Sequence, residues 1–67
     1  MGENKQAILD ALVDCLRLTR DQHDLLDLEY DQEHEIVTVR WENGAKAVNV
    51  ALDSGIAMIR DVLNAIR

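Results

Sequence analysis

The sequence predicts an α+β fold of order αβββα, in which two helices pack on one face of a three-stranded antiparallel meander. Near both ends of the chain, apolar residues recur every three or four positions, as on amphipathic helices. Between these segments they alternate with polar residues, as on half-buried strands. Asn43-Gly44 interrupts the alternation with the residues best suited to a type I′ hairpin turn. A chain of 67 residues is expected to form one small domain, 1–67.

The first helix is predicted to cover roughly residues 4–20. Its apolar side chains gather on one face of a helical projection: Ile8, Leu9, Leu12, Val13 and Leu16. Asn4 suits the N-cap, where its side chain accepts a hydrogen bond from a free amide of the first turn. Cys15 is expected beside the apolar face.

The first strand is predicted at about residues 25–30, where Leu26, Leu28 and Tyr30 alternate with acidic residues. A loop, Asp31–His34, should lead to the second strand. If Tyr30 then faces Glu35, Leu28 faces Val37 and Leu26 faces Val39. This register places the apolar side chains of the first two strands on the same face.

The central hairpin, Glu35–Val50, has a register that follows from its turn. With the turn at Asn43-Gly44, Val39 faces Val48 and Val37 faces Val50. Because side chains alternate along a strand, one face then carries Val37, Val39, Trp41, Val48 and Val50. In an alternative reading, residues 46–52 join a long second helix. The alternation of Val48 and Val50 after the turn disfavours that alternative.

The second helix is predicted to begin after Asp53 or Ser54, either of which suits the N-cap, and to run to about Arg67. Its apolar residues form two neighbouring stripes. One stripe contains Ile56, Ile59, Leu63 and Ile66, and the other contains Met58, Val62 and Ala65.

Together these stripes are wider than one small sheet requires. One interpretation is that the helix lies between the first helix and the sheet and is simply well buried. The other is that Met58, Val62 and Ala65 form the interface of a homodimer or of a complex with a protein partner, since methionine and small residues suit adaptable surfaces. An unpaired edge strand, at 25–30 or at 45–50, offers a second route to self-association.

The charge of the chain narrows the range of partners. A net charge of −6 argues against binding to nucleic acid or to an anionic membrane, because both reward Lys and Arg. The acidity is concentrated in residues 21–35, which contain no Lys or Arg. This acidic span is expected to be a solvated surface, with a docking surface for a basic partner as the alternative. On the solvent face of the sheet, Arg40 is expected diagonal to Asp27.

No group of residues in the sequence forms a recognisable catalytic, cofactor or metal site. Cys15 has no histidine placed to act as its base, and Ser54 is explained by helix capping. His23 and His34 stand among carboxylates in links, where histidines are usually solvated. Asp27, Glu29 and Asp31 lack the glycine and the distal glutamate of a calcium-binding loop. Trp41 and Tyr30 are expected to point into the core, which leaves no exposed aromatic side chain to stack on a small-molecule ligand. Because the sequence also shows no catalytic group, no enzyme activity is expected.

The chain also lacks sequence features of a secreted or membrane protein. Its polar N-terminus has no apolar run suited to a signal peptide, and no segment has the apolar length needed to span a bilayer. A single cysteine, Cys15, excludes an internal disulfide. We therefore expect a cytoplasmic protein in which Cys15 is reduced.

The αβββα order and the length resemble those of double-stranded-RNA-binding domains, in topology only. The family contacts phosphates with a lysine cluster at the start of the second helix and with a loop between the first two strands. Here these positions read Asp53-Ser54-Gly55-Ile56 and Asp31-Gln32-Glu33-His34. Carboxylates there would repel RNA. The function expected from the sequence is a small non-enzymatic protein-interaction or structural module that self-associates through the second helix or a sheet edge. A nucleic-acid-associated regulator is the alternative.

Overall fold

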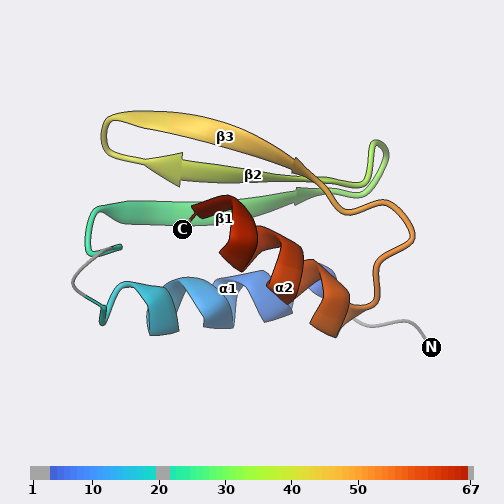
Figure 1. The fold of residues 1–67 in the computed structure, drawn as a ribbon, viewed down its shortest axis with the longest axis horizontal. Helices are drawn as coiled ribbons and strands as arrows, with labels where there is room; N and C mark the ends of the chain where they lie inside the picture. The colour runs from blue at the N-terminus through green and yellow to red at the C-terminus, as the bar shows by residue number, and fades with distance from the viewer. Residues whose placement is uncertain (1–3, 20–21, 67) are drawn as a thin grey trace.

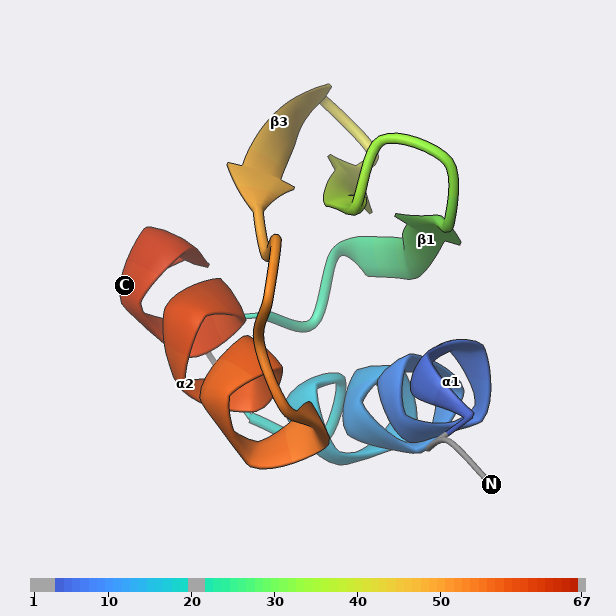
Figure 2. The same ribbon diagram turned by 90° about the vertical axis from the view of Figure 1, so that its right-hand side faces the viewer.

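The structure, a computed structural model, describes residues 4–19 and 22–66 (Figure 1). The elements follow the order α1 (Lys5–Leu16), β1 (Leu25–Asp31), β2 (Ile36–Trp41), β3 (Gly44–Asn49) and α2 (Gly55–Ile66). The strands form one antiparallel sheet in the order β1-β2-β3. Both helices lie on the same face of this sheet (Figures 1 and 2). The predicted α+β class and the αβββα order are therefore confirmed.

Both helices begin at the predicted capping residues. The Asn4 side chain accepts a hydrogen bond from the amide of Ala7 at 3.0 Å, and the Ser54 hydroxyl accepts one from the amide of Ala57 at 3.2 Å. The helix α1 ends at Leu16, earlier than the predicted end at residue 20, which lies outside the described residues. The Thr19 hydroxyl donates to the Leu16 carbonyl at 2.7 Å and so satisfies one of the carbonyls left free at the helix end.

The hairpin of β2 and β3 forms, but its register differs by two residues from the predicted one. Trp41 pairs with Gly44, and Val37 pairs with Val48. The turn residues are therefore Glu42 and Asn43, so the predicted turn at Asn43-Gly44 is wrong. A turn between Val50 and Asp53 ends the strand, so Leu52 is not available to pair with Glu35 as the predicted register requires.

The pairing of β1 with β2 is also shifted by two residues, because Tyr30 faces Val37 and Leu28 faces Val39. A β-bulge between Leu25 and Asp27 inserts one extra residue into β1. The side chains before the bulge therefore point to the sheet face opposite to the one that strict alternation predicts. As a result Leu25 is fully buried and Leu26 is 51% exposed. The prediction that Leu26 faces the core is therefore wrong, and the bulge is the reason.

The core lies between the sheet and the two helices. Its buried members come from all five elements and the segment after β3: Leu9, Val13, Leu25, Leu28, Val37, Val39, Val48, Val50, Met58 and Val62. All five apolar residues predicted on the inner face of the central hairpin are buried or packed against this core: Val37, Val39, Trp41, Val48 and Val50. A shift of two residues preserves the face of every side chain, which is why the predicted face holds although the register does not.

The stripe of α2 that was considered for an interface belongs to the core. Met58 and Val62 have no exposed surface, and Ala65 is partly buried and packs against the core. In the other stripe Ile56 is 81% exposed, Ile59 and Leu63 are partly buried, and Ile66 packs against the core. The expectation that Met58 and Val62 form an interface is therefore wrong, since neither side chain offers surface to a partner in this fold.

Candidate functional site

The two edges of the sheet are the strands β1 and β3, and the outer edge of β1 is closed by a side chain. The Gln6 amide in α1 donates from Nε2 to the Leu28 carbonyl at 2.9 Å and accepts at Oε1 from the Tyr30 amide at 2.8 Å. The side-chain amide thus supplies the donor and the acceptor that a neighbouring strand would supply. The helix α1 lies against β1 and positions this residue (Figure 2).

The outer edge of β3 has no such cover among the described residues. The amide of Val50 donates to the carbonyl of Glu35 at 3.0 Å, so the backbone groups of Val50 point toward β2. This hydrogen bond shows which residues of β3 direct their backbone groups toward β2 and which direct them away. Backbone groups of an antiparallel pair point alternately toward and away from the partner. Those of Ala45, Ala47 and Asn49 therefore point away from β2.

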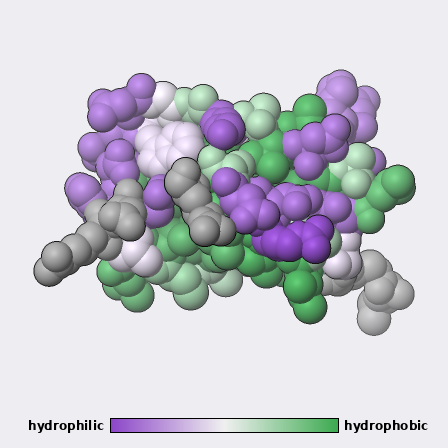
Figure 3. Space-filling model, viewed as in Figure 1, coloured by the Kyte–Doolittle hydropathy of each residue, from purple (hydrophilic) through white to green (hydrophobic). Residues whose placement is uncertain are grey.

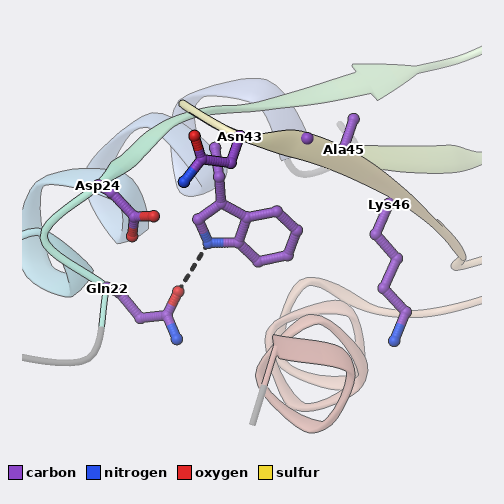
Figure 4. A pocket seen from close by; sticks show the side chains of 7 residues that line it. Gln22, Asp24, Asn43, Ala45 and Lys46 are labelled. Atoms are coloured by element: carbon purple, nitrogen blue, oxygen red, sulfur yellow. Dashed lines mark hydrogen bonds between the residues drawn. The ribbon is translucent and has the colours of Figure 1, made fainter.

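The side chains at these three positions are small, uncharged and exposed. Within 4–19 and 22–66, no backbone hydrogen bond beyond the β2 ladder engages β3. The only charged side chain of the strand is Lys46, whose ammonium group donates to the Ala65 carbonyl at 3.0 Å. Lys46 therefore lies over the C-terminal end of α2 and on the helix side of the sheet (Figure 4).

A pocket of about 530 Å³ lies beside the start of β3 (Figure 4). The residues that line it are Gln22, Asp24, Trp41, Asn43, Gly44, Ala45 and Lys46. The Trp41 indole donates to the Gln22 side chain at 2.9 Å, and Gln22 donates to the Ile66 carbonyl at 3.2 Å. Trp41 is thus half-buried: it packs against the core as expected and also forms one wall of this pocket. The pocket offers polar, charged and aromatic groups, and its lining residues include no Ser, Thr, Cys or His.

The outer face of the sheet neutralises part of the acidic span. Arg40 lies directly opposite Asp27, not diagonal to it, and binds both oxygens of that carboxylate at 2.7 Å. A guanidinium nitrogen of Arg40 also lies 3.2 Å from Glu29. The hydrogen bonds from Arg40 hold the pKa of Asp27 below its usual value. Two of the carboxylates that resembled a calcium-binding loop therefore share a cation from the neighbouring strand.

The remaining acidic loop is organised by Asp31. Its carboxylate accepts hydrogen bonds from the backbone amides of Glu33 and His34 and lies 2.9 Å from the His34 ring nitrogen Nδ1. These hydrogen bonds, with that to the His34 ring the largest cause, lower the pKa of Asp31. Within the described part of the chain, no three His, Cys, Asp or Glu side chains are grouped in a way that could hold a metal ion.

A second pair of acids lies beside α2. A hydrogen bond shared with the Asp61 carboxyl raises the pKa of Asp53, and burial adds to this effect. The Oδ2 atom of Asp53 is buried without a hydrogen-bond partner. Two carboxyls in contact share a bond only when one of them is protonated, so the ionised pair is unfavourable in the folded state.

Several large apolar side chains remain outside the core. Leu18, Leu52 and Ile56 are 89%, 97% and 81% exposed. Apolar side chains also gather over the helices, along the lower edge of the molecule in Figure 3. Leu52 additionally has a positive φ of 64°, which is unusual for a residue with a bulky side chain. Cys15 is exposed on α1.

No family model, no curated protein and no solved structure matches this chain. None of the described helices has the length and apolar character needed to cross a membrane.

Proposed function

We propose that the protein is a small non-catalytic interaction or structural module that self-associates through the free edge of its sheet. The observation that carries this proposal is the contrast between the two edges. Gln6 satisfies two outward backbone groups of β1, the Leu28 carbonyl and the Tyr30 amide, whereas those of Ala45, Ala47 and Asn49 on β3 have no partner among the described residues. A free edge is a template for pairing with another chain.

The strand β3 lacks two of the common means of protecting such an edge. Pro, a bulge or an inward-pointing charge usually prevents edge-to-edge pairing, and β3 has only the last of these, Lys46 on the helix side of the sheet. The sequence contains no proline, and the register of β3 with β2 is continuous from Gly44 to Asn49. Lys46 is the one charge on the strand, and its ammonium group is engaged by the C-terminal end of α2. These features support pairing in preference to protection.

The polar side chains of possible chemical interest have structural roles that favour a non-catalytic function. The Ser54 hydroxyl caps α2, and the Asp31 carboxylate holds the loop that contains His34. A location in the cytoplasm is part of the proposal, because the exposed thiol of Cys15 suits a reducing compartment.

The alternative, a nucleic-acid-associated regulator, rests on the αβββα order alone. Fold order does not determine function, and a net charge of −6 opposes contact with phosphates. Electrophoretic mobility of duplex RNA at low salt tests this alternative. We expect no shift at protein concentrations at which self-association is complete.

Sedimentation equilibrium tests the main proposal. We expect the weight-average mass to rise from 7.6 kDa toward twice that value between about 10 µM and 1 mM protein, the range appropriate to a small interface. A mass that remains that of the monomer over the whole range, in a folded sample, would contradict self-association.

A further inference from the structure

We infer that β3 pairs antiparallel with β3 of a second copy of this chain, with the two-fold axis at Ala47, so that two sheets become one continuous sheet. This inference rests on the proposed self-association and specifies its surface, partner and register. The outward backbone groups belong to Ala45, Ala47 and Asn49, as the bond from Val50 to Glu35 establishes. These groups alone are available to a new strand on that side.

The spacing of these residues selects one register. With the axis at Ala47, Ala45 pairs with Asn49 of the second copy, Ala47 pairs with itself, and Asn49 pairs with Ala45. In each of these three pairs, the two opposite residues exchange backbone hydrogen bonds. Moving the axis by one residue in either direction leaves only two such pairs within the strand.

Charge excludes one of the shifted registers. An axis at Lys46 would place the two Lys46 side chains directly opposite each other, and like charges in that position are destabilising. With the axis at Ala47, Lys46 faces Val48 of the second copy instead. The side chains on the outer face of the seam are then Ala45, Ala47 and Asn49 from both copies, which are small and uncharged.

The distribution of charge along the chain also suits a second copy as the partner. The protein carries a net charge of −6, yet residues 43–52 contain no Asp or Glu. The acidic side chains of the strands all lie on β1, where Asp27 and Glu29 contact Arg40 of β2. Two identical molecules can therefore meet at β3 with their acidic surfaces far apart.

The helix α2 crosses the inner face diagonally, with its N-terminal end beside α1 and its C-terminal end on the β3 side (Figure 2). With the axis at Ala47, the helices of both copies lie on the same face of the continuous sheet, and the side chain of Lys46 lies between the seam and the C-terminal end of its own α2.

Charge exchange at the axis is the first test. Ala47→Lys and Ala47→Glu each place like charges opposite each other, so each variant alone should be a monomer at 500 µM, whereas an equal mixture should recover the dimer. The matched control is the same pair of substitutions at Ile56, which is 81% exposed on α2. Dimers that persist in both Ala47 variants but are lost in both Ile56 variants would overturn the inference and leave the proposed self-association intact.

Cysteine cross-linking tests the register in a Cys15→Ser background. The Cα atoms of a hydrogen-bonded antiparallel pair lie about 5.5 Å apart, within the range that a disulfide spans. We expect Ala47→Cys to form a disulfide-linked dimer under mild oxidation, and Ala45→Cys to do so at least tenfold more slowly. Equal rates, or faster cross-linking through Ala45→Cys, would overturn the axis at Ala47. A monomer at every concentration in the unmodified chain would instead refute the proposed function itself.

Discussion

Gln6 is the residue on which the difference between the two sheet edges depends. Its side-chain amide donates to the Leu28 carbonyl and accepts from the Tyr30 amide, as the backbone of a neighbouring strand would. It also donates to Asp10 at 2.9 Å. A partly buried amide with both ends bonded is costly to remove, because the backbone groups it satisfied lose their partners.

We expect Gln6→Ala to lower the free energy of unfolding by about 1–2 kcal/mol, since two backbone groups of β1 lose their hydrogen bonds. Urea unfolding monitored by circular dichroism measures the change. Gln32→Ala, at an exposed loop position, is the matched control and should alter stability by less than about 0.5 kcal/mol. Equal effects of the two substitutions would contradict the role assigned to Gln6.

Asp53 gives a pH-dependent prediction. Its pKa is raised in the folded protein by Asp61, so the folded state favours the protonated form. The corresponding stability is present below the ordinary value of 3.8 and is lost as the pH rises through the folded pKa. At pH 7 the folded protein therefore carries the cost of the ionised pair.

We expect Asp53→Asn to raise the Tm at pH 7, because the new amide donates to Asp61, and the gain to shrink as the pH falls below about 4. Thermal melts at several pH values measure it. Asp14→Asn, exposed on α1, should leave the Tm nearly unchanged. A gain that grows toward acidic pH would show that the sign assigned to Asp53 is wrong.

Single residues were the part of the molecule least accessible to prediction. Capping by Asn4 and Ser54 could be predicted because the cap depends on residues only three positions away. Gln6 could not be identified, because its partners on β1 are more than twenty positions distant and a glutamine in the first turn of a helix is unremarkable. Only the three-dimensional placement of α1 along the sheet edge reveals its role.

At the scale of elements, α2 illustrates the limit of periodicity. Both of its stripes repeat at helical spacing, so the sequence alone assigns neither to the core. The structure buries Met58 and Val62 and exposes Ile56, because the side of the helix that carries Met58 and Val62 packs in the core.

Met58→Ala is expected to cost about 3 kcal/mol, the usual range for opening a cavity at a fully buried methionine. Ile56→Ala, at an exposed position of the other stripe, should cost no more than about 0.5 kcal/mol. The free energy of unfolding in urea measures both variants. A larger loss in the Ile56 variant would mean that the two stripes have been assigned to the wrong sides.

The strands show why faces are easier to predict than registers. The inward apolar residues of the central hairpin were predicted correctly, because a register shift of two residues leaves the same alternate side chains pointing toward the helices. The turn was predicted one residue too late, since the local preference of Asn43-Gly44 competes with the turn that ends β3 after Val50. The bulge at Leu25 gave no sequence signal, and it alone changed a face.

At the scale of the whole molecule, the net charge of −6 opposes association of two copies. The proposed seam contains no acidic residue, so the repulsion is long-range and not part of the contact. Salt screens charges over about 10 Å at 0.1 M ionic strength.

We therefore expect self-association to strengthen several-fold when NaCl is raised from about 20 to 300 mM, because screening weakens the repulsion between the two copies. Sedimentation equilibrium at both salt concentrations measures the dissociation constant. Ala47→Pro is the control: it removes an outward amide that β2 does not use, keeps the fold and should remain monomeric throughout. Dissociation of the unmodified chain by salt would indicate an interface held by ion pairs.

The position of Trp41 has a practical consequence. It is the only tryptophan of the chain, and its indole is linked through Gln22 to the carbonyl of Ile66 at the end of α2. Its fluorescence therefore depends on whether the C-terminal helix is docked. The unlabelled protein thus contains an optical reporter for the packing of its last element, and stopped-flow refolding followed at this one fluorophore can time that event separately from the formation of the sheet.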